Sequence, residues 1–428
     1  MAHSLNPTDA YALINLLVKE ATGQDNEIQA VDSSSFVSVG ERILATGTEN
    51  TLNALSRVLG RTFMAVRPYN APLMLINSEN SGLYTDRMRK ISFYSREAQA
   101  SGAFNTDIHI QHAPNLDNGT NDNISGTTAN TGLGTMWEQN PPVPLEVNFA
   151  SRDVWDDSTT IYEVQLQNAF RSEANFSAFM AGVMTEKGND IESQKEAFNR
   201  MTLLNFMAGV YDLANGDAND KRLIDLKAGF NAKYGTNYTT AQLLSTYLEE
   251  FLKYFVAVYK TVSDYLTIRS NQFHWSPEKV VNDVSYTLLR HTPKDRQRAF
   301  LYAPLFIDAE AQVMSGIFNP EYLDIGRYEK VTHWQNINNP MAIDVTPAIP
   351  DTSNPNGVQV TGQRVRLSNV VGMIFDTDAV MVDYQLDRSY STPVEARKAY
   401  RNIWWHFSKG AINDFTENAV VFYLGEDD

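Results

Sequence analysis

The chain has 428 residues, 43% of them hydrophobic, which is enough for two or three domains or for one elongated molecule with arms. It contains no Cys, so disulfides and thiolate metal sites are excluded. Its formal net charge of −16 argues against nucleic-acid binding along the whole chain, because neutralising phosphates requires an excess of Lys and Arg. The simplest role for this charge is to keep the protein soluble.

The first 65 residues are predicted to form a helical N-terminal arm. A capped amphipathic helix begins at Thr8 or Asp9. A polar linker over residues 24–35 and a short strand-like run then lead to a second helix, which Gly60 ends. No basic segment precedes a long apolar core here, and no apolar run approaches the roughly 18 residues of a membrane span, so we expect synthesis in the cytosol without membrane contact.

Residues 80–160 are predicted to form a long extended loop. Two strand-like arms flank residues 113–135, which are rich in Asn, Gly and Thr and have few large apolar side chains. Such a composition cannot bury enough surface to offset the entropy of the backbone, so we expect a mobile tip. A loop of this length inside one compact domain would be unusual, and we therefore expect it to reach onto a neighbouring subunit.

Helices are predicted over residues 165–215. A first helix should break at Gly188–Asn189, and a second should run from Asp190 to Ala214. About 25 residues at ~1.5 Å each give a rod of roughly 37 Å. Its apolar stripe is expected to lie on a long sheet. We assign to that stripe Phe198, Met201 and Leu204, and to the polar face Glu196.

The second half of the chain mixes a third helical block, residues 239–268, with short strands over residues 299–385. Residues 347–362 are rich in Pro, Asn and Gly and should form a surface excursion. The last strands are predicted within Val370–Leu424. On the strand around residues 403–407, the buried set is either Ile403, Trp405 and Phe407 or the alternate residues with Trp404.

No pattern of catalytic or metal-binding residues is found. His109 and His112 are three apart, but their surroundings favour a strand, on which the two rings would point to opposite faces. Asp376, Asp378 and Asp383 could hold a cation, but a turn stabilised by Asp is the favoured interpretation. The sequence has no Walker loop, dinucleotide-binding glycine motif or nucleophile elbow. We predict no catalytic residue, cofactor or metal.

Several segments resemble the major capsid proteins of tailed phages, in particular the lineage of small short-tailed phages. They are VGERIL with LNALSRVLGRTFMAVRPYNAPL near the N-terminus, FLYAPLFIDAEAQVMSGIF in the middle, and near the end DTDAVMVDY, a basic aromatic strand and NAVVFYL. The order of elements along most of the chain is also similar to that family.

This resemblance implies an α+β protein with the capsid fold that tailed phages share with herpesvirus capsid floors. The expected parts are an N-terminal arm (1–65), an extended loop (80–160), a peripheral domain with a long spine helix (66–79, 161–235 and 386–414) and a central α/β domain (236–385 and 415–428).

The implied function is self-assembly, as pentamers and hexamers, into an icosahedral or prolate phage head around double-stranded DNA. The expected partners are further copies of the chain, portal and scaffolding proteins, and DNA as non-specific cargo. The expected location is the virion capsid, assembled in the host cytoplasm. An encapsulin-like nanocompartment shell with protein cargo is the alternative, and a hydrolase or other enzyme is a more distant one.

Candidate residues for contacts between subunits are basic. Arginine and lysine at the base of the extended loop stand out in an acidic chain, and further arginines lie at the last long strand, where a solvated strand face is an equally good interpretation. The predicted interface residues are Arg87, Arg89, Lys90, Arg96, Arg397 and Arg401.

Overall fold

The computed structural model describes residues 7–22, 29–45, 50–51, 54–55, 73, 76–79, 88–95, 142–149, 152–214, 220–277, 279–281, 284–305, 307, 328–354 and 359–426. Helices and strands are mixed, so the predicted α+β class is confirmed. The chain divides into two compact units. Unit 1 comprises Met1–Asp86, Ser151–Thr202 and Met381–Ile412, and unit 2 comprises Arg87–Ala150, Leu203–Val380 and Asn413–Asp428.

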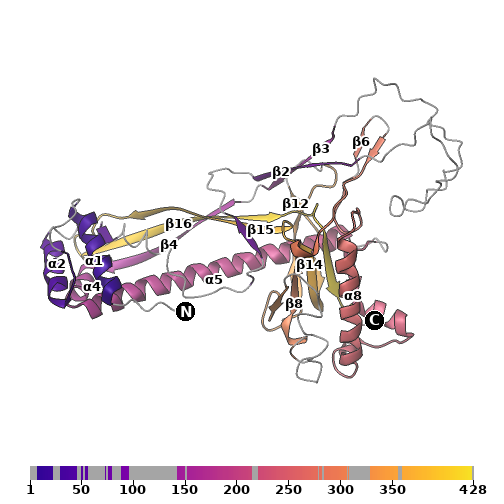
Figure 1. Cartoon of the computed structure of the whole chain (residues 1–428), viewed down its shortest axis with the longest axis horizontal. Coiled ribbons are helices and arrows are strands. Elements are labelled where there is room, and N and C mark those ends of the chain that lie inside the picture. The colour runs from indigo at the N-terminus through magenta and orange to yellow at the C-terminus, as the bar shows by residue number, and fades with distance from the viewer. Residues whose placement is uncertain are drawn as a thin grey trace. The chain divides into compact units, whose positions relative to one another are not determined.

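Unit 1 is built on a four-stranded sheet with the strand order β1-β15-β16-β4. Its strands are β1 (Asn77–Glu79), β15 (Val380–Ser391), β16 (Tyr400–Asn413) and β4 (Arg152–Tyr162). Strands β16 and β4 pair antiparallel over their full length, and the long strands run beside helix α5 (Glu173–Ala214) (Figure 1). Burial alternates along β16, and Ile403, Trp405 and Phe407 are the buried set, the first of the two that the sequence allowed.

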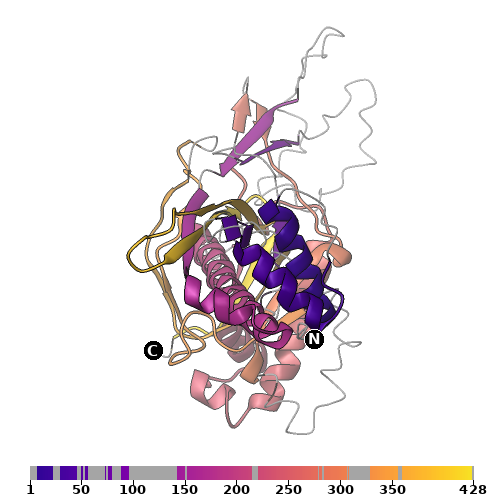
Figure 2. The same ribbon diagram turned by 90° about the vertical axis from the view of Figure 1, so that its left-hand side faces the viewer.

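The core of unit 1 joins this sheet to the N-terminal helices α1 (Pro7–Thr22) and α2 (Ser33–Ala45). Figure 2 shows both helices beside α4 (Glu163–Ala169) and the start of α5. The contacts are aromatic: the rings of Phe36 and Phe176 are 5.6 Å apart, and Phe176 stacks on Phe170 at 5.5 Å. The described part of the predicted arm therefore contributes to a hydrophobic core.

Helix α2 corrects the sequence prediction, which placed a polar linker and a strand-like run here. The side chain of Asp32 accepts a hydrogen bond from Ser35 N at 2.8 Å, and the hydroxyl of Ser35 accepts one from Asp32 N at 3.0 Å. This pair caps the start of a helix. The apolar residues Phe36, Val39 and Ile43 then recur at helical spacing and are all buried. Over so few residues, the alternation of Phe and Val imitated a strand.

Helix α5 also differs from its prediction, because it runs without a break through Gly188–Asn189. Its 42 residues correspond to about 63 Å of helix. A glycine inside a helix costs only about 1 kcal/mol, which packing can offset. Around Gly188 the helix is well anchored, since Lys187 pairs with Asp157 of β4 at 2.9 Å and Ile191 is buried in the core. The predicted end at Ala214 is confirmed.

The predicted apolar stripe of α5 needs one correction. Phe198 and Leu204 are buried, at 5% exposure each, but Met201 is 54% exposed. The buried side chains instead recur every fourth residue, at Phe198, Thr202 and Phe206. Steps of three and of four residues both fit a helix, so spacing alone does not choose between these two stripes. In unit 1 the ring of Phe198 meets Tyr384 edge-on and lies under the ammonium group of Lys409.

Unit 2 contains a five-stranded sheet with the strand order β5-β17-β14-β8-β9. Its strands are β5 (Leu223–Asp225), β17 (Ala419–Tyr423), β14 (Val370–Asp376), β8 (Gln297–Tyr302) and β9 (Tyr328–Val331). The central strand β14 is buried along its whole length and pairs antiparallel with β17 and β8. The apolar strand-like runs at 370–375, 379–382, 403–407 and 419–424 of the sequence thus overlap β14, β15, β16 and β17, so the prediction of strands there is confirmed.

Aromatic side chains cover both faces of this sheet. Paired residues share a face, so the β14–β17 register places Phe375 and Phe422 on opposite faces. Phe422 contacts helix α8 (Leu248–Leu266), where Tyr259 lies 5.7 Å away between ring centroids. On the other face, Phe206 of α5 lies 6.4 Å from Phe375 and stacks on Phe415 at 5.0 Å. The sheet is thus held between two helices.

Shorter elements complete unit 2. They are β2 (Met88–Phe93), β3 (Pro144–Phe149), α6 (Leu226–Tyr234), α7 (Thr240–Leu243), β6 (Lys279–Val281), β7 (Val284–Tyr286), η4 (Lys294–Arg296), β10 (Ile343–Val345), β11 (Ala348–Ile349), β12 (Val360–Thr361) and β13 (Val365–Leu367). The third helical block is split into α7 and α8. Within the predicted excursion at 347–362, β11 and β12 pair with each other, and Ala348 N donates to Asn205 of α5 at 2.8 Å.

The two units are defined by contacts within the chain, and their boundaries include 202/203, 380/381 and 412/413. The assignment of the units to an arm, a peripheral domain and a central domain stays a prediction. In the described part of the chain, every helix is too short or too polar to cross a membrane.

Candidate functional site

The described residues of the predicted extended loop (80–160) fall in two places. Strands β2 and β3 form an antiparallel hairpin in unit 2, whereas residues 152–160 belong to β4 in the sheet of unit 1, which corrects the predicted end of the loop. On one face, Lys90 and Ser92 lie opposite Val147 and Leu145, and these side chains turn toward the body of the unit. The other face carries exposed side chains. They belong to Arg89, Ile91, Phe93 and Pro144. The hairpin therefore has an anchored face and a free face.

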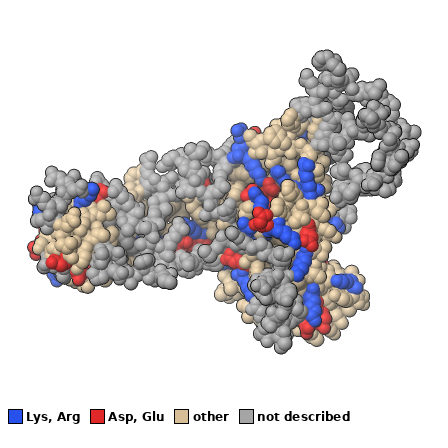
Figure 3. Space-filling view, viewed as in Figure 1, with Lys and Arg blue, Asp and Glu red and all other residues tan. Residues whose placement is uncertain are grey.

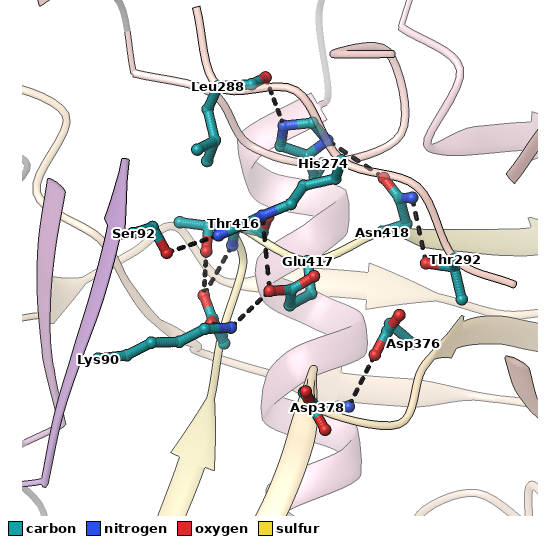
Figure 4. Close-up of polar contacts among 12 residues, drawn as sticks. Lys90, Ser92, His274, Leu288, Thr292, Asp376, Asp378, Thr416, Glu417 and Asn418 are labelled. Carbon is teal, nitrogen blue, oxygen red and sulfur yellow. Dashed lines mark hydrogen bonds and ion pairs between the residues drawn. The ribbon is translucent and has the colours of Figure 1, made fainter. Parts of the chain in front are cut away.

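The anchored face ends in a cluster of buried charges (Figure 4). Lys90 Nζ lies 2.5 Å from Asp414 Oδ2 and 2.5 Å from Glu417 Oε1. Both acidic residues belong to the turn between β16 and β17, and their side chains are 1% and 11% exposed. One lysine thus ties the base of the hairpin to a turn more than 300 residues later in the chain.

Arg290 is the second cation of this cluster. Its Nη2 donates to Ser92 Oγ at 2.6 Å, its Nε donates to Thr416 O at 3.2 Å, and the same Nε lies 3.5 Å from Glu417 Oε1. Arginine therefore bridges β2 and the same turn. Two cations face two anions, so the cluster is electrically balanced, which is the condition under which buried charges are tolerated.

The opposite charges in this cluster affect the pKa values of Lys90 and Glu417. Burial by itself would lower the pKa of Lys90, but Asp414 and Glu417 beside it have the larger combined effect and raise that pKa. Burial raises the pKa of Glu417, and Asp414 adds to this, while Lys90 and Arg290 act in the opposite direction. Asp414 also closes the turn, because its Oδ1 accepts hydrogen bonds from Thr416 N at 2.9 Å and Thr416 Oγ1 at 2.6 Å.

A buried histidine continues this polar network. His274 Nδ1 lies 3.1 Å from Asn418 Oδ1, and Nε2 lies 3.0 Å from Leu288 O. Asn418 donates in turn to Thr292 Oγ1 at 3.2 Å. Burial lowers the pKa of His274 to about 4, with Arg290 among the smaller contributions in the same direction. The ring is therefore neutral at pH 7, and it donates its single N–H to one of the two oxygens.

This histidine predicts a loss of subunit stability in mild acid. Its folded pKa of about 4 lies below the ordinary value of 6.5, so between these pH values the unfolded chain binds the proton and the folded chain does not. The contribution is present above pH 6.5 and is lost as the pH falls toward 4. We expect it to lower the free energy of unfolding by about 2 kcal/mol at pH 5 relative to pH 7.

The measurement is urea unfolding of the unassembled subunit at both pH values for the wild type, His274→Asn and the control His291→Asn, which replaces an exposed histidine of the same unit. His274→Asn should remove this part of the acid sensitivity, and His291→Asn should retain it. Glu417, whose pKa is raised, acts in the opposite direction in all three proteins and cancels in the comparison. An unchanged acid sensitivity in His274→Asn would contradict the assignment.

The other predicted interface residues lie in different surroundings. Arg89 points to the free face of the hairpin, 58% exposed at the side chain and 3.8 Å from Glu146 of β3. Arg397 is exposed, whereas Arg401 on β16 is only 2% exposed. Arg87 and Arg96 lie outside the described residues. Lys90 has its carboxylate partners in its own chain, unlike the inter-subunit pairing expected from the sequence. The interface role of all six stays a prediction.

The suspected metal ligands lie in ordinary structural positions. Asp376 Oδ1 accepts from Asp378 N at 3.0 Å, and Arg296 pairs with both carboxylates, so the predicted Asp-stabilised turn is confirmed. Asp383 is buried in β15. Within the described ranges, no group of three His, Asp or Glu residues could hold a metal ion. His109 and His112 lie outside those ranges.

Sequence reasoning missed Arg290, Asp414, Glu417, His274 and Asn418. The one available signal was the mainly polar segment 413–418 between two apolar strands. Such a segment predicts a turn but not its contacts. The sequence does not say which distant cation meets it.

Comparison with known proteins places the chain. No curated protein matches its sequence. The capsid of Staphylococcus phage Andhra is similar in structure, with a TM-score of 0.44, 11% identity and 84% of each chain covered. The capsid of Cyanophage P-SCSP1u has a TM-score of 0.39, 12% identity, and coverage of 82% of this chain and 87% of the other. The family model described as Phi29-like phage major capsid protein matches residues 125–423. The chain therefore belongs to the Phi29-like family of phage major capsid proteins.

Proposed function

We propose that the chain is the repeating subunit of a phage head, assembling as pentamers and hexamers into an icosahedral or prolate shell around double-stranded DNA. The observation that carries this proposal is the family match over residues 125–423. It favours a phage capsid over the encapsulin-like alternative with protein cargo. The role implies portal and scaffolding proteins as partners and assembly in the host cytoplasm.

The chemistry of the hairpin base supports a structural role rather than catalysis. Catalytic acids, bases and nucleophiles must reach a substrate. Here Lys90, Asp414 and Glu417 bind one another and are largely buried. Such contacts fix the position of the hairpin on the body of unit 2, and a loop that holds a neighbouring subunit needs a rigid base. We propose that this is the purpose of the cluster.

The charge distribution supports DNA as cargo rather than as a tightly bound ligand. The chain carries 51 acidic and 35 basic residues. On the face drawn in Figure 3, Lys and Arg lie among Asp and Glu rather than apart from them. A surface of this kind offers few neutralising contacts to phosphates, so packaged DNA can slide past it.

The test is to express and purify the chain, together with scaffolding protein if no shells form without it. The product is then examined by electron microscopy and by a DNA-binding assay. We expect closed shells, and we expect empty shells to bind duplex DNA weakly with little dependence on salt. Soluble subunits that form no shells under any of these conditions would contradict the proposal. Sub-micromolar DNA binding with a steep salt dependence would indicate a nucleic-acid-binding protein instead.

A further inference from the structure

Unit 2 contains a cavity of about 960 Å³ that none of the contacts described above uses. One wall is the second half of α8 with the segment that follows it, up to Phe273. The opposite wall is β5, the segment before it and α6. Strand β5 is only three residues long and lies at the edge of the five-stranded sheet. The cavity therefore opens where the described sheet ends.

The rim of this cavity exposes large apolar side chains. Tyr265, at the end of α8, is 52% exposed, and Ile268, just beyond it, is 50% exposed. Inside, Ser270 is 6% exposed, and its hydroxyl finds no hydrogen-bond partner among the described residues. A buried polar group without a partner costs about 1–3 kcal/mol. An apolar rim above an unused hydroxyl is a surface that a second molecule can complete.

The charges at the cavity indicate what kind of molecule fits. The lining contains two acidic residues, Asp220 and Asp225, and two basic residues, Lys221 and Lys233. Its net formal charge is therefore zero. Asp225 also caps α6, since it accepts hydrogen bonds from the first backbone N–H groups of that helix. Such a lining does not select a polyanion. A protein surface with apolar side chains and few charges matches it better.

We infer that a segment of a second copy of this chain enters the cavity when subunits assemble, with apolar side chains against Tyr265 and Ile268 and a polar group against Ser270. The inference rests on the proposed self-assembly. Copies that each carry a formal charge of −16 repel one another, and they can approach most closely where both surfaces are apolar and locally neutral. The cavity with Tyr265 and Ile268 is such a place, and a shell supplies the second copy at fixed stoichiometry.

The absence of Cys from the chain permits a clean test. Ile268→Cys introduces a single thiol, and its reaction with a small maleimide is timed in unassembled subunits and in shells of the purified protein. We expect the reaction to slow by at least about tenfold in shells, equivalent to ~1.4 kcal/mol. The matched control is Ile337→Cys, at an isoleucine of the same unit that is 76% exposed, and it should slow far less.

A second pair of variants tests the inference without chemical labelling. Ile268→Asp should reduce the yield of shells while leaving the melting temperature of the subunit unchanged, and Ile337→Asp should change neither. Shells that form normally while the thiol at position 268 stays as reactive as in subunits would overturn the inference and leave the proposed function intact. Equal protection at both positions, or protection that requires another protein, would also overturn it. Failure of the wild type to form shells would instead contradict the proposed function.

Discussion

Lys90→Met is expected to destabilise the subunit by roughly 2–4 kcal/mol, because it leaves the buried carboxylates of Asp414 and Glu417 without their common cation. The value lies toward the lower end for buried pairs, since 29% of the Lys90 side chain is exposed and Arg290 still faces Glu417. The free energy of unfolding by urea measures the effect on the unassembled subunit. Hydrogen exchange of the β2 and β3 amides should show the loss of protection in the hairpin itself.

The neighbouring residue provides the control. Arg89 lies on the same strand with the same charge, but its side chain is 58% exposed and 3.8 Å from Glu146. Exposed pairs of this kind contribute ~0–1 kcal/mol, so Arg89→Met should change subunit stability little. Adding Asp414→Asn to Lys90→Met should recover part of the loss, because the amide still accepts the hydrogen bond from Thr416 N. A larger effect from Arg89→Met than from Lys90→Met would refute the assignment of the cluster.

This cluster shows where prediction from sequence ends. The sequence predicts that Lys90 contacts a neighbouring subunit, and in the structure its ammonium group pairs with two carboxylates. The sequence offered no means of finding that the carboxylates are Asp414 and Glu417 of the same chain. A salt bridge between distant positions leaves no local pattern, whereas a helix or a strand leaves a repeat over a few residues.

The strands of the last fifty residues were predictable for that reason. Val370–Asp376 and Ala419–Tyr423 are buried on both faces and therefore appear as continuous apolar runs. Along β16 the alternation of buried and exposed residues was equally clear, although sequence did not decide which set faced the core. That choice depends on tertiary packing, since Trp405 shares one hydrophobic core with buried residues of α5 and the N-terminal helices.

Two helix predictions were wrong, one because tertiary contacts outweighed a local signal and the other because a local capping signal was missed. Gly188 predicted a break in α5, but the helix there is held by the ion pair of Lys187 with Asp157 and by buried Ile191. In α2 the deciding contact was the Asp32–Ser35 cap, which fixed a helix in a sequence with strand-like alternation. Both errors lie in unit 1, where long elements pack over many residues.

Phe206→Ala is expected to have the largest effect on the subunit, a loss of about 3–5 kcal/mol in the free energy of unfolding. The side chain is fully buried in unit 2, where it stacks on Phe415 at 5.0 Å and meets Phe375 of the central strand at 6.4 Å. Its removal leaves a cavity between α5 and the sheet that these aromatic neighbours cannot refill without leaving their own contacts. Urea unfolding and the soluble yield of unassembled subunit measure the result.

The control for this variant is Phe93→Ala, which removes the same side chain from the free face of the hairpin in the same unit. Phe93 is 59% exposed, so its removal creates no internal cavity, and the unassembled subunit should lose less than about 1 kcal/mol. A defect of Phe93→Ala should appear only on assembly, if the free face of the hairpin contacts a neighbouring subunit. Phe206→Ala should instead fail before assembly, with aggregated subunits and few particles. Equal stability of the two variants as unassembled subunits would show that α5 does not pack on this sheet as the contacts of Phe206 indicate.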